Sequence, residues 1–260
     1  MKFNSRQIIV LVGCLALFAI IYFGLDTKTP DQKAFEKSRV STIEATGIQN
    51  IVMDAKKSLT KEQLNIVETL QSEFQNTQDD SLKVDKAKSL ASKWYEIGFP
   101  IVSGYYAEEI ANIENTQEAW SITGTTYSIG LKNATSEKEL QFAKGRAVKA
   151  FENAISLADD NVSDKINLAL IYVDYPDTSP MQGIQMLLKL NESNPDNVQV
   201  MNQLARLAIR SNQIDKAITR LEKALTLEPD NNNSICLIAQ AYQLAGNDAK
   251  AVEFQNKCRK

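Results

Sequence analysis

The sequence predicts an all-α protein, and three observations support that prediction. Its 260 residues include only ten Gly and six Pro, and residues that favour helices, such as Ala, Leu, Lys, Glu and Gln, dominate. No stretch shows the alternation of apolar and polar residues that a half-buried strand requires. Apolar residues instead recur four and three apart, as in Ala217, Leu221 and Ala224, a spacing that a helix places on one face.

The composition argues against several kinds of function. The formal net charge is −3 and no basic stripe is present, so nucleic acid is not an expected partner. The chain has no histidine, which rules out Ser-His and Cys-His nucleophiles and removes the commonest metal ligand. It also lacks a Walker loop, a G-x-G-x-x-G motif, a C-x-x-C pair and a calcium loop. We therefore expect no enzyme activity, no metal and no cofactor.

The amino-terminal region predicts a membrane anchor. Residues 8–25 are eighteen apolar or small residues without a charge, enough for about 27 Å of helix and close to the thickness of a bilayer core. Lys2 and Arg6 precede this segment, a bias that keeps the short end in the cytoplasm. A cleaved secretory signal and a lipoprotein signal acylated at Cys14 remain as alternatives.

The carboxy-terminal half shows a period of 34 residues. Shifting the sequence by 34 carries Ala217 onto Ala251, and shifting it backward carries Pro229 onto Pro195. Each period contains two helical segments with small residues where the helices would cross, and Pro ends two of the periods. One such helix pair leaves an apolar face exposed, and stacking the next pair buries it.

This unit resembles the tetratricopeptide repeat family. In "EAWSITGTTY", the residues Trp120, Gly124 and Tyr127 fit the family signature, with Thr123 in place of the usual Leu. The resemblance implies a right-handed α-solenoid of helical hairpins in which the first helix of each repeat lines a concave, partner-binding face.

We predict four repeats within residues 117–260. The third, Val198–Asn231, and the fourth, Asn232–Lys260, keep strict register. The second is looser, with a turn "DYPDTSP" about two residues too long for the pattern. The first carries eleven extra residues and a capping box at Ser136–Glu139, which predicts a long second helix.

Upstream of the repeats, residues 81–116 read as another helical hairpin and as a possible degenerate repeat. Thr60–Gln63 is a second capping box and predicts the start of a helix. The expected organisation is a cytoplasmic end at 1–7, an anchor at 8–25, a tether at 26–47, a helical region at 48–116 and four repeats at 117–260.

Candidate binding residues are the side chains of the first helices that packing does not use. They are Asn202, Arg206 and Arg210 in the third repeat, Cys236, Gln240 and Gln243 in the fourth, and Thr125 and Ser128 in the first. Arg206 and Arg210 would suit a partner's carboxylate, and a solvated basic face is the alternative. Cys236 and Cys258 are expected to be helix-packing residues. The alternative is a disulfide between them in an oxidising compartment, which needs their Cα atoms within about 7 Å.

These features predict an interaction scaffold that binds peptides or partner proteins. The layout is similar to that of bacterial inner-membrane tetratricopeptide proteins, which implies a single-pass protein with a periplasmic carboxy-terminal domain that serves envelope protein assembly or maturation. The alternative is a structural homo-oligomer that associates through residues 48–76 and uses the repeats as a spacer.

Overall fold

The structure, a computed structural model, describes residues 47–258. These residues form helices and turns and no strand, so the all-α prediction is confirmed for them. The expected membrane anchor at 8–25 lies outside the described residues. Among residues 47–258, no helix has the length and apolar character needed to cross a bilayer. The chain divides into two units, Met1–Asn50 and Ile51–Lys260, and the second contains all the elements considered below.

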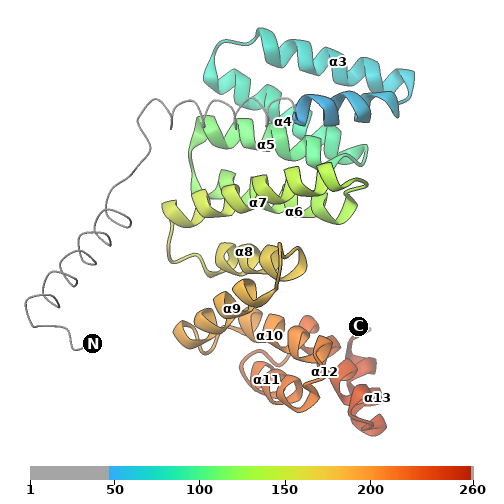
Figure 1. Cartoon of the computed structure of the whole chain (residues 1–260), viewed down its shortest axis with the longest axis vertical. Helices are drawn as coiled ribbons and strands as arrows, with labels where there is room; N and C mark the ends of the chain where they lie inside the picture. The colour runs from blue at the N-terminus through green and yellow to red at the C-terminus, as the bar shows by residue number, and fades with distance from the viewer. Residues whose placement is uncertain (1–46, 259–260) are drawn as a thin grey trace, which may run out of the picture. The chain divides into compact units, whose positions relative to one another are not determined.

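The second unit is a succession of helices in chain order (Figure 1). The described residues open with a helix at 47–57. It is followed by α3 (Lys61–Asn76), α4 (Asp80–Glu96), α5 (Pro100–Glu114), α6 (Gln117–Asn133), α7 (Glu137–Leu157), α8 (Val162–Asp174), α9 (Met181–Ser193), α10 (Val198–Arg210), α11 (Ile214–Leu227), α12 (Asn232–Leu244) and α13 (Asp248–Cys258). From α3 onward every helix contacts the next one along the chain, which is the local contact pattern of a solenoid.

The hairpin of α6 and α7 shows why the signature residues are needed. Trp120 and Tyr127 are buried. At Gly124 an added Cβ would lie 2.8 Å from ring atoms of Phe151, so only glycine lets the aromatic ring come this close. The resulting core packs a large ring of α7 against the bare backbone of α6.

The predicted capping boxes have different outcomes. At Thr60 both reciprocal hydrogen bonds with Gln63 are present, so that box is confirmed. At the start of α7, Ser136 accepts a hydrogen bond from the backbone N–H of Glu139. The Glu139 carboxylate, however, accepts from the backbone N–H and hydroxyl of Thr135. The helix is 21 residues long, as the extra residues of the first unit predict.

The hairpins of α8 with α9 and of α10 with α11 cross at small residues. An added Cβ at Gly183 would lie 2.3 Å from the carbonyl oxygen of Ala169, which no side chain tolerates. In the next hairpin Ala205 and Ala217 are both fully buried in one apolar cluster. Small residues at the crossing therefore set the distance between the paired helices.

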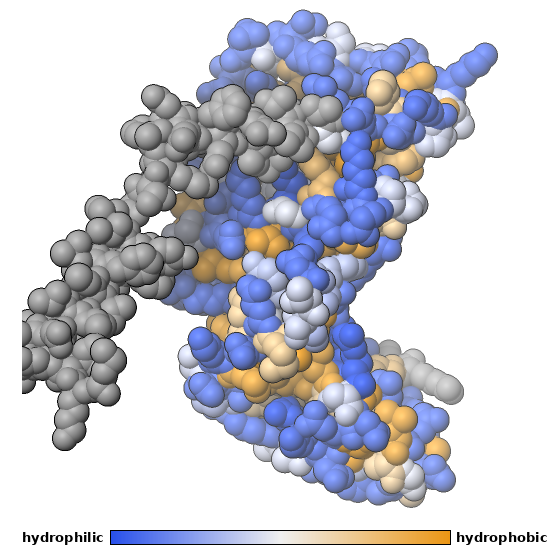
Figure 2. All heavy atoms as spheres, viewed as in Figure 1, coloured by the Kyte–Doolittle hydropathy of each residue, from blue (hydrophilic) through white to orange (hydrophobic). Residues whose placement is uncertain are grey.

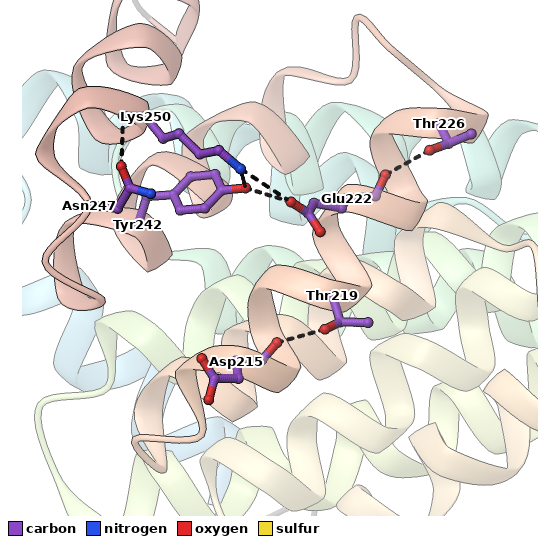
Figure 3. A network of polar contacts seen from close by, with 7 residues as sticks. All are labelled: Asp215, Thr219, Glu222, Thr226, Tyr242, Asn247 and Lys250. Atoms are coloured by element: carbon purple, nitrogen blue, oxygen red, sulfur yellow. Dashed lines mark hydrogen bonds and ion pairs between the residues drawn. The ribbon is translucent and has the colours of Figure 1, made fainter.

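A polar contact network joins the last three helices (Figure 3). The hydroxyl of Tyr242 donates to the Glu222 carboxylate at 2.6 Å, and the Lys250 ammonium donates to the Tyr242 oxygen at 2.9 Å. Burial is the main cause that raises the pKa of Tyr242, so at neutral pH its hydroxyl keeps the proton that it donates. One tyrosine of α12 thus connects α11 with α13.

The expectation for the two cysteines is wrong, because the structure joins Cys236 and Cys258 in a disulfide with a Cα–Cα distance of 5.0 Å. The reason lies in the hairpin geometry. Cys236 is near the start of α12 and Cys258 ends α13, and an antiparallel pair brings these two positions together.

Neighbouring hairpins also meet at two recurring positions of their first helices. Each first helix has a small residue where it crosses its partner helix. The first junction position lies three residues before that small residue and is occupied by Ser121, Ile166 and Asn202 in successive hairpins. The second position lies five residues before the small residue of the following hairpin and is occupied by Asp164, Val200 and Ser234. Ser121 donates to Asp164 at 2.6 Å, and Ser234 donates to Asn202 at 2.8 Å. Ile166 and Val200 belong to one apolar cluster. The same two positions therefore build consecutive junctions with different chemistry.

Candidate functional site

A cavity of about 380 Å³ lies along the first helices of three successive hairpins. Its lining comes mainly from α6, α8 and α10, the helices that the resemblance predicts to form the binding face. The lining residues are Thr125, Ser128, Ile129, Leu131, Lys132, Phe151, Asn167, Leu170, Ile171, Asp174, Tyr175, Gln203 and Arg206. We refer to this set as the first-helix cavity.

The charged residues of the cavity are partly paired with one another. The Asp174 carboxylate accepts hydrogen bonds from Arg206 at 3.3 Å and from Arg210 at 2.7 Å. The Nε atom of Arg206 is buried and has no hydrogen-bond partner. Lys132 also lines the cavity, so the cations in and beside it outnumber the single carboxylate. The site therefore favours a negative group on a ligand.

Two side-chain amides in the cavity have no partner among the described residues. Asn167 on α8 and Gln203 on α10 are half-buried, and neither amide makes a hydrogen bond within residues 47–258. A side-chain amide both donates and accepts hydrogen bonds. These two groups are therefore available to bind a ligand.

The remaining lining supplies apolar surface and a phenol. Ile129 and Leu170 are half-buried and offer side chains for apolar contact. Burial, and secondarily the charge of Asp174, raise the pKa of Tyr175. Its hydroxyl is therefore protonated at neutral pH and can donate a hydrogen bond.

The structure brings three of the predicted binding residues together. Thr125, Ser128 and Arg206 line the same cavity from two different helices. The Ser128 hydroxyl donates to the carbonyl oxygen of Gly124 at 2.8 Å, so only its lone pairs are available to a ligand. Arg210 lies beside the cavity and is bonded to Asp174. Both arginines therefore already hold a carboxylate of the chain itself.

Asn202 does not face an open surface, contrary to the sequence-based expectation. Its side chain is 2% exposed. Its amide donates to the side-chain oxygen of Asn231 at 3.3 Å, and its oxygen accepts from Ser234. These bonds hold α10 against the start of α12, and the residue has no free surface for a partner.

The candidates of the fourth hairpin are exposed but lie apart from the cavity. Gln240 and Gln243 are both on the surface of α12, and Gln243 accepts a hydrogen bond from Gln255 at 3.3 Å. Cys236 is held in the disulfide. Their role in partner binding stays a prediction.

The sequence reasoning missed Asn167, Gln203 and Asp174. The repeat register was a usable signal. Ala169 and Ala205 occupy the equivalent crossing position of their units, so Asn167 aligns with Gln203 and Asp174 aligns with Arg210. Applying the repeat register to the looser second unit would have found them. Among residues 47–258, no group of three or more acidic or sulfur side chains is placed to hold a metal ion.

The sequence model described as Tetratricopeptide repeat matches residues 198–231. This is the third predicted unit with the boundaries that the 34-residue period gives, so the resemblance predicted from the sequence is confirmed for that unit. No curated protein sequence matches the chain.

Several solved structures are similar in fold to part of the chain. A crystal structure of MamA is 18% identical, with a TM-score of 0.45, and the match covers 67% of this chain and 89% of that chain. MamA from Desulfovibrio magneticus RS-1 is 16% identical, with a TM-score of 0.45 and coverage of 68% and 93%. YrrB, described as a TPR protein with an unusual peptide-binding site, is 14% identical, with a TM-score of 0.40 and coverage of 66% and 83%. At these scores the likenesses say nothing about a shared ligand.

Proposed function

We propose that this chain is a non-catalytic scaffold that binds an extended segment of a partner protein in the first-helix cavity. The observation that carries the proposal is the pair of half-buried, unpaired amides, Asn167 and Gln203, at equivalent positions of neighbouring helices. An extended peptide presents both N–H and C=O groups along its backbone, and amide side chains pair with both. Ile129 and Leu170 would contact its apolar side chains.

We further propose that the repeats lie outside the cytoplasm, tethered by residues 8–25, in a protein that serves envelope protein assembly or maturation. The length and apolar character of that segment support the anchor. The disulfide between Cys236 and Cys258 supports an oxidising compartment, because disulfides are rare in the cytosol. Protease treatment of intact spheroplasts tests this topology: we expect the large fragment to be digested, and its protection would contradict the placement.

Site-specific photo-cross-linking in cells tests the binding site. A photoreactive residue at Gln203 should give adducts of discrete mass, whereas the same residue at Gln240 should not, because Gln240 is exposed on a first helix but lies outside the cavity. Equal adducts from both positions would contradict the site.

A binding measurement with the cross-linked partner gives the matched comparison. Asn167→Ala combined with Gln203→Ala should weaken binding about tenfold, since two hydrogen bonds are lost. Gln240→Ala combined with Gln243→Ala removes the same number of amides from a first helix. If the partner binds in the cavity alone, this variant leaves binding unchanged, and the sequence-based prediction for these two residues fails. A similar loss in both double variants would remove the assignment of the amides.

A further inference from the structure

A second groove lies on the other side of α10, between α9 and α11. It has a volume of about 530 Å³. Met181, Ile184 and Leu188 of α9 form one wall, and Leu204 and Leu207 of α10 form its floor. Figure 2 shows apolar residues gathered over the part of the molecule where α9 and α10 lie. Met181 is 51% exposed and Leu188 is 40% exposed, so this wall presents apolar side chains to water.

The opposite wall of the groove is cationic. Arg210, Lys216 and Arg220 line it, and no acidic residue does. Lys216 and Arg220 lie one helical turn apart on α11. Within residues 47–258 neither pairs with a carboxylate: the Lys216 ammonium donates to the side-chain oxygen of Gln213 at 2.7 Å, and the Arg220 guanidinium donates to the backbone carbonyl of Lys216 at 3.4 Å. Arg210 is paired with Asp174, so the unneutralised positive charge of this wall comes from Lys216 and Arg220, in a chain whose formal net charge is −3.

The chemistry of the two walls identifies the occupant. Apolar side chains are needed over the α9 wall, and carboxylates are needed beside α11. A single helix supplies both when an apolar stripe at i, i+3, i+4 and i+7 runs beside an acidic flank. We propose that the groove between α9 and α11 docks an acidic amphipathic helix of a partner protein.

A protein helix fits this groove better than a membrane surface does. Leu204 on the floor is only 4% exposed, so a planar lipid surface would meet the rim cations and Leu188 without reaching it. A rod-shaped element framed by helices on both sides reaches the floor and the walls together. Gln203 and Arg206 line the first-helix cavity, whereas Leu204 and Leu207 line this groove, so the two sites use different faces of α10. Their one shared contact is the ion pair between Arg210 and Asp174.

The test uses the full chain in a non-ionic detergent and a fluorescent synthetic peptide of about 18 residues, long enough to form a helix on binding. The peptide carries a Leu stripe and a Glu flank, and a second peptide replaces each Glu by Lys. We expect the acidic peptide to bind at least tenfold more tightly than the basic one, because complementary charge decides between equal apolar stripes. Equal binding of the two peptides would overturn the proposal.

Paired variants locate the binding. Lys216→Glu with Arg220→Glu should weaken the acidic peptide at least tenfold. Lys61→Glu with Lys149→Glu changes the net charge equally at two exposed lysines outside the groove and should leave binding unchanged. Met181→Gln with Leu188→Gln alters two exposed side chains, so the fold should hold while binding falls. An equal effect of the two charge-reversal pairs would overturn the site.

Mixed micelles that contain an anionic phospholipid serve as the competing ligand. If they bind through Lys216 and Arg220 while the peptide does not bind, the groove is a lipid site and the proposal fails. Cross-linking from Gln203 in the same charge-reversal variant should be unchanged, which separates failure of this groove from failure of the first-helix cavity.

Discussion

The junction between α6 and α8 and the junction between α8 and α10 use equivalent positions with opposite chemistry. The first pairs Ser121 with the fully buried Asp164, which also accepts a hydrogen bond from Gln117 at 2.5 Å. At the second, Ile166 and Val200 are both buried in one apolar cluster. The repeat therefore determines which positions face each other at a junction. The two residues at a junction are either both polar and hydrogen-bonded or both apolar.

The largest expected effect comes from placing a charged side chain in the apolar junction. Val200→Asp buries a carboxylate opposite Ile166 without a donor, and we expect it to cost more than about 4 kcal/mol of the free energy of unfolding. Denaturant unfolding followed by circular dichroism measures the loss. Adding Ile166→Ser, which copies the pair at the other junction, should recover part of it. A loss below about 1 kcal/mol for the single variant would contradict the account.

Converting the polar junction tests the comparison in the other direction. Asp164→Val alone leaves Ser121 and Gln117 without their acceptor and should cost about 1–3 kcal/mol. Combining it with Ser121→Ile recreates the apolar pair, and the double variant should be more stable than Asp164→Val. A double-mutant cycle gives the coupling free energy. Additive losses would show that the two positions do not interact.

The smallest effect is expected at the junction between α10 and α12. Asn202→Ala removes the acceptor of Ser234 and the donor to Asn231, and we expect a cost of about 1–2 kcal/mol. Cross-linking from Gln203 should be unchanged, because Asn202 is bonded within the junction. Loss of cross-linking in a folded Asn202→Ala protein would return this residue to the binding site.

The sequence predicts the hairpins better than the contacts between them. Gly124, Ala205 and Ala217 reveal where paired helices cross, because a small residue at a fixed spacing has one structural explanation. Asn202 has two structural explanations, since an amide side chain on a helix is either solvated or hydrogen-bonded across a junction. The choice depends on Ser234, which lies 32 residues later.

The candidate site was predicted in part for a similar reason. Thr125, Ser128 and Arg206 follow from applying the repeat register to the regular units. Pairing of Arg206 with Asp174 spans 32 residues, and whether a carboxylate reaches a guanidinium depends on how far apart the two helices stand. The cationic groove was missed because Lys216 and Arg220 lie on a second helix, where the resemblance implies no binding face.

The recurring junction positions also bear on how such a chain can be rearranged by gene duplication. Exchanging the hairpin of α8 and α9 with that of α10 and α11 would set Ser121 against Val200, Asn202 against Asp164 and Ile166 against Ser234. Two of the three new boundaries, those at Val200 and at Ile166, would then set a polar side chain against an apolar one, although each hairpin kept its own core. A few buried side chains thus constrain the order of the hairpins, and reshuffling them would require substitutions at the two mismatched boundaries.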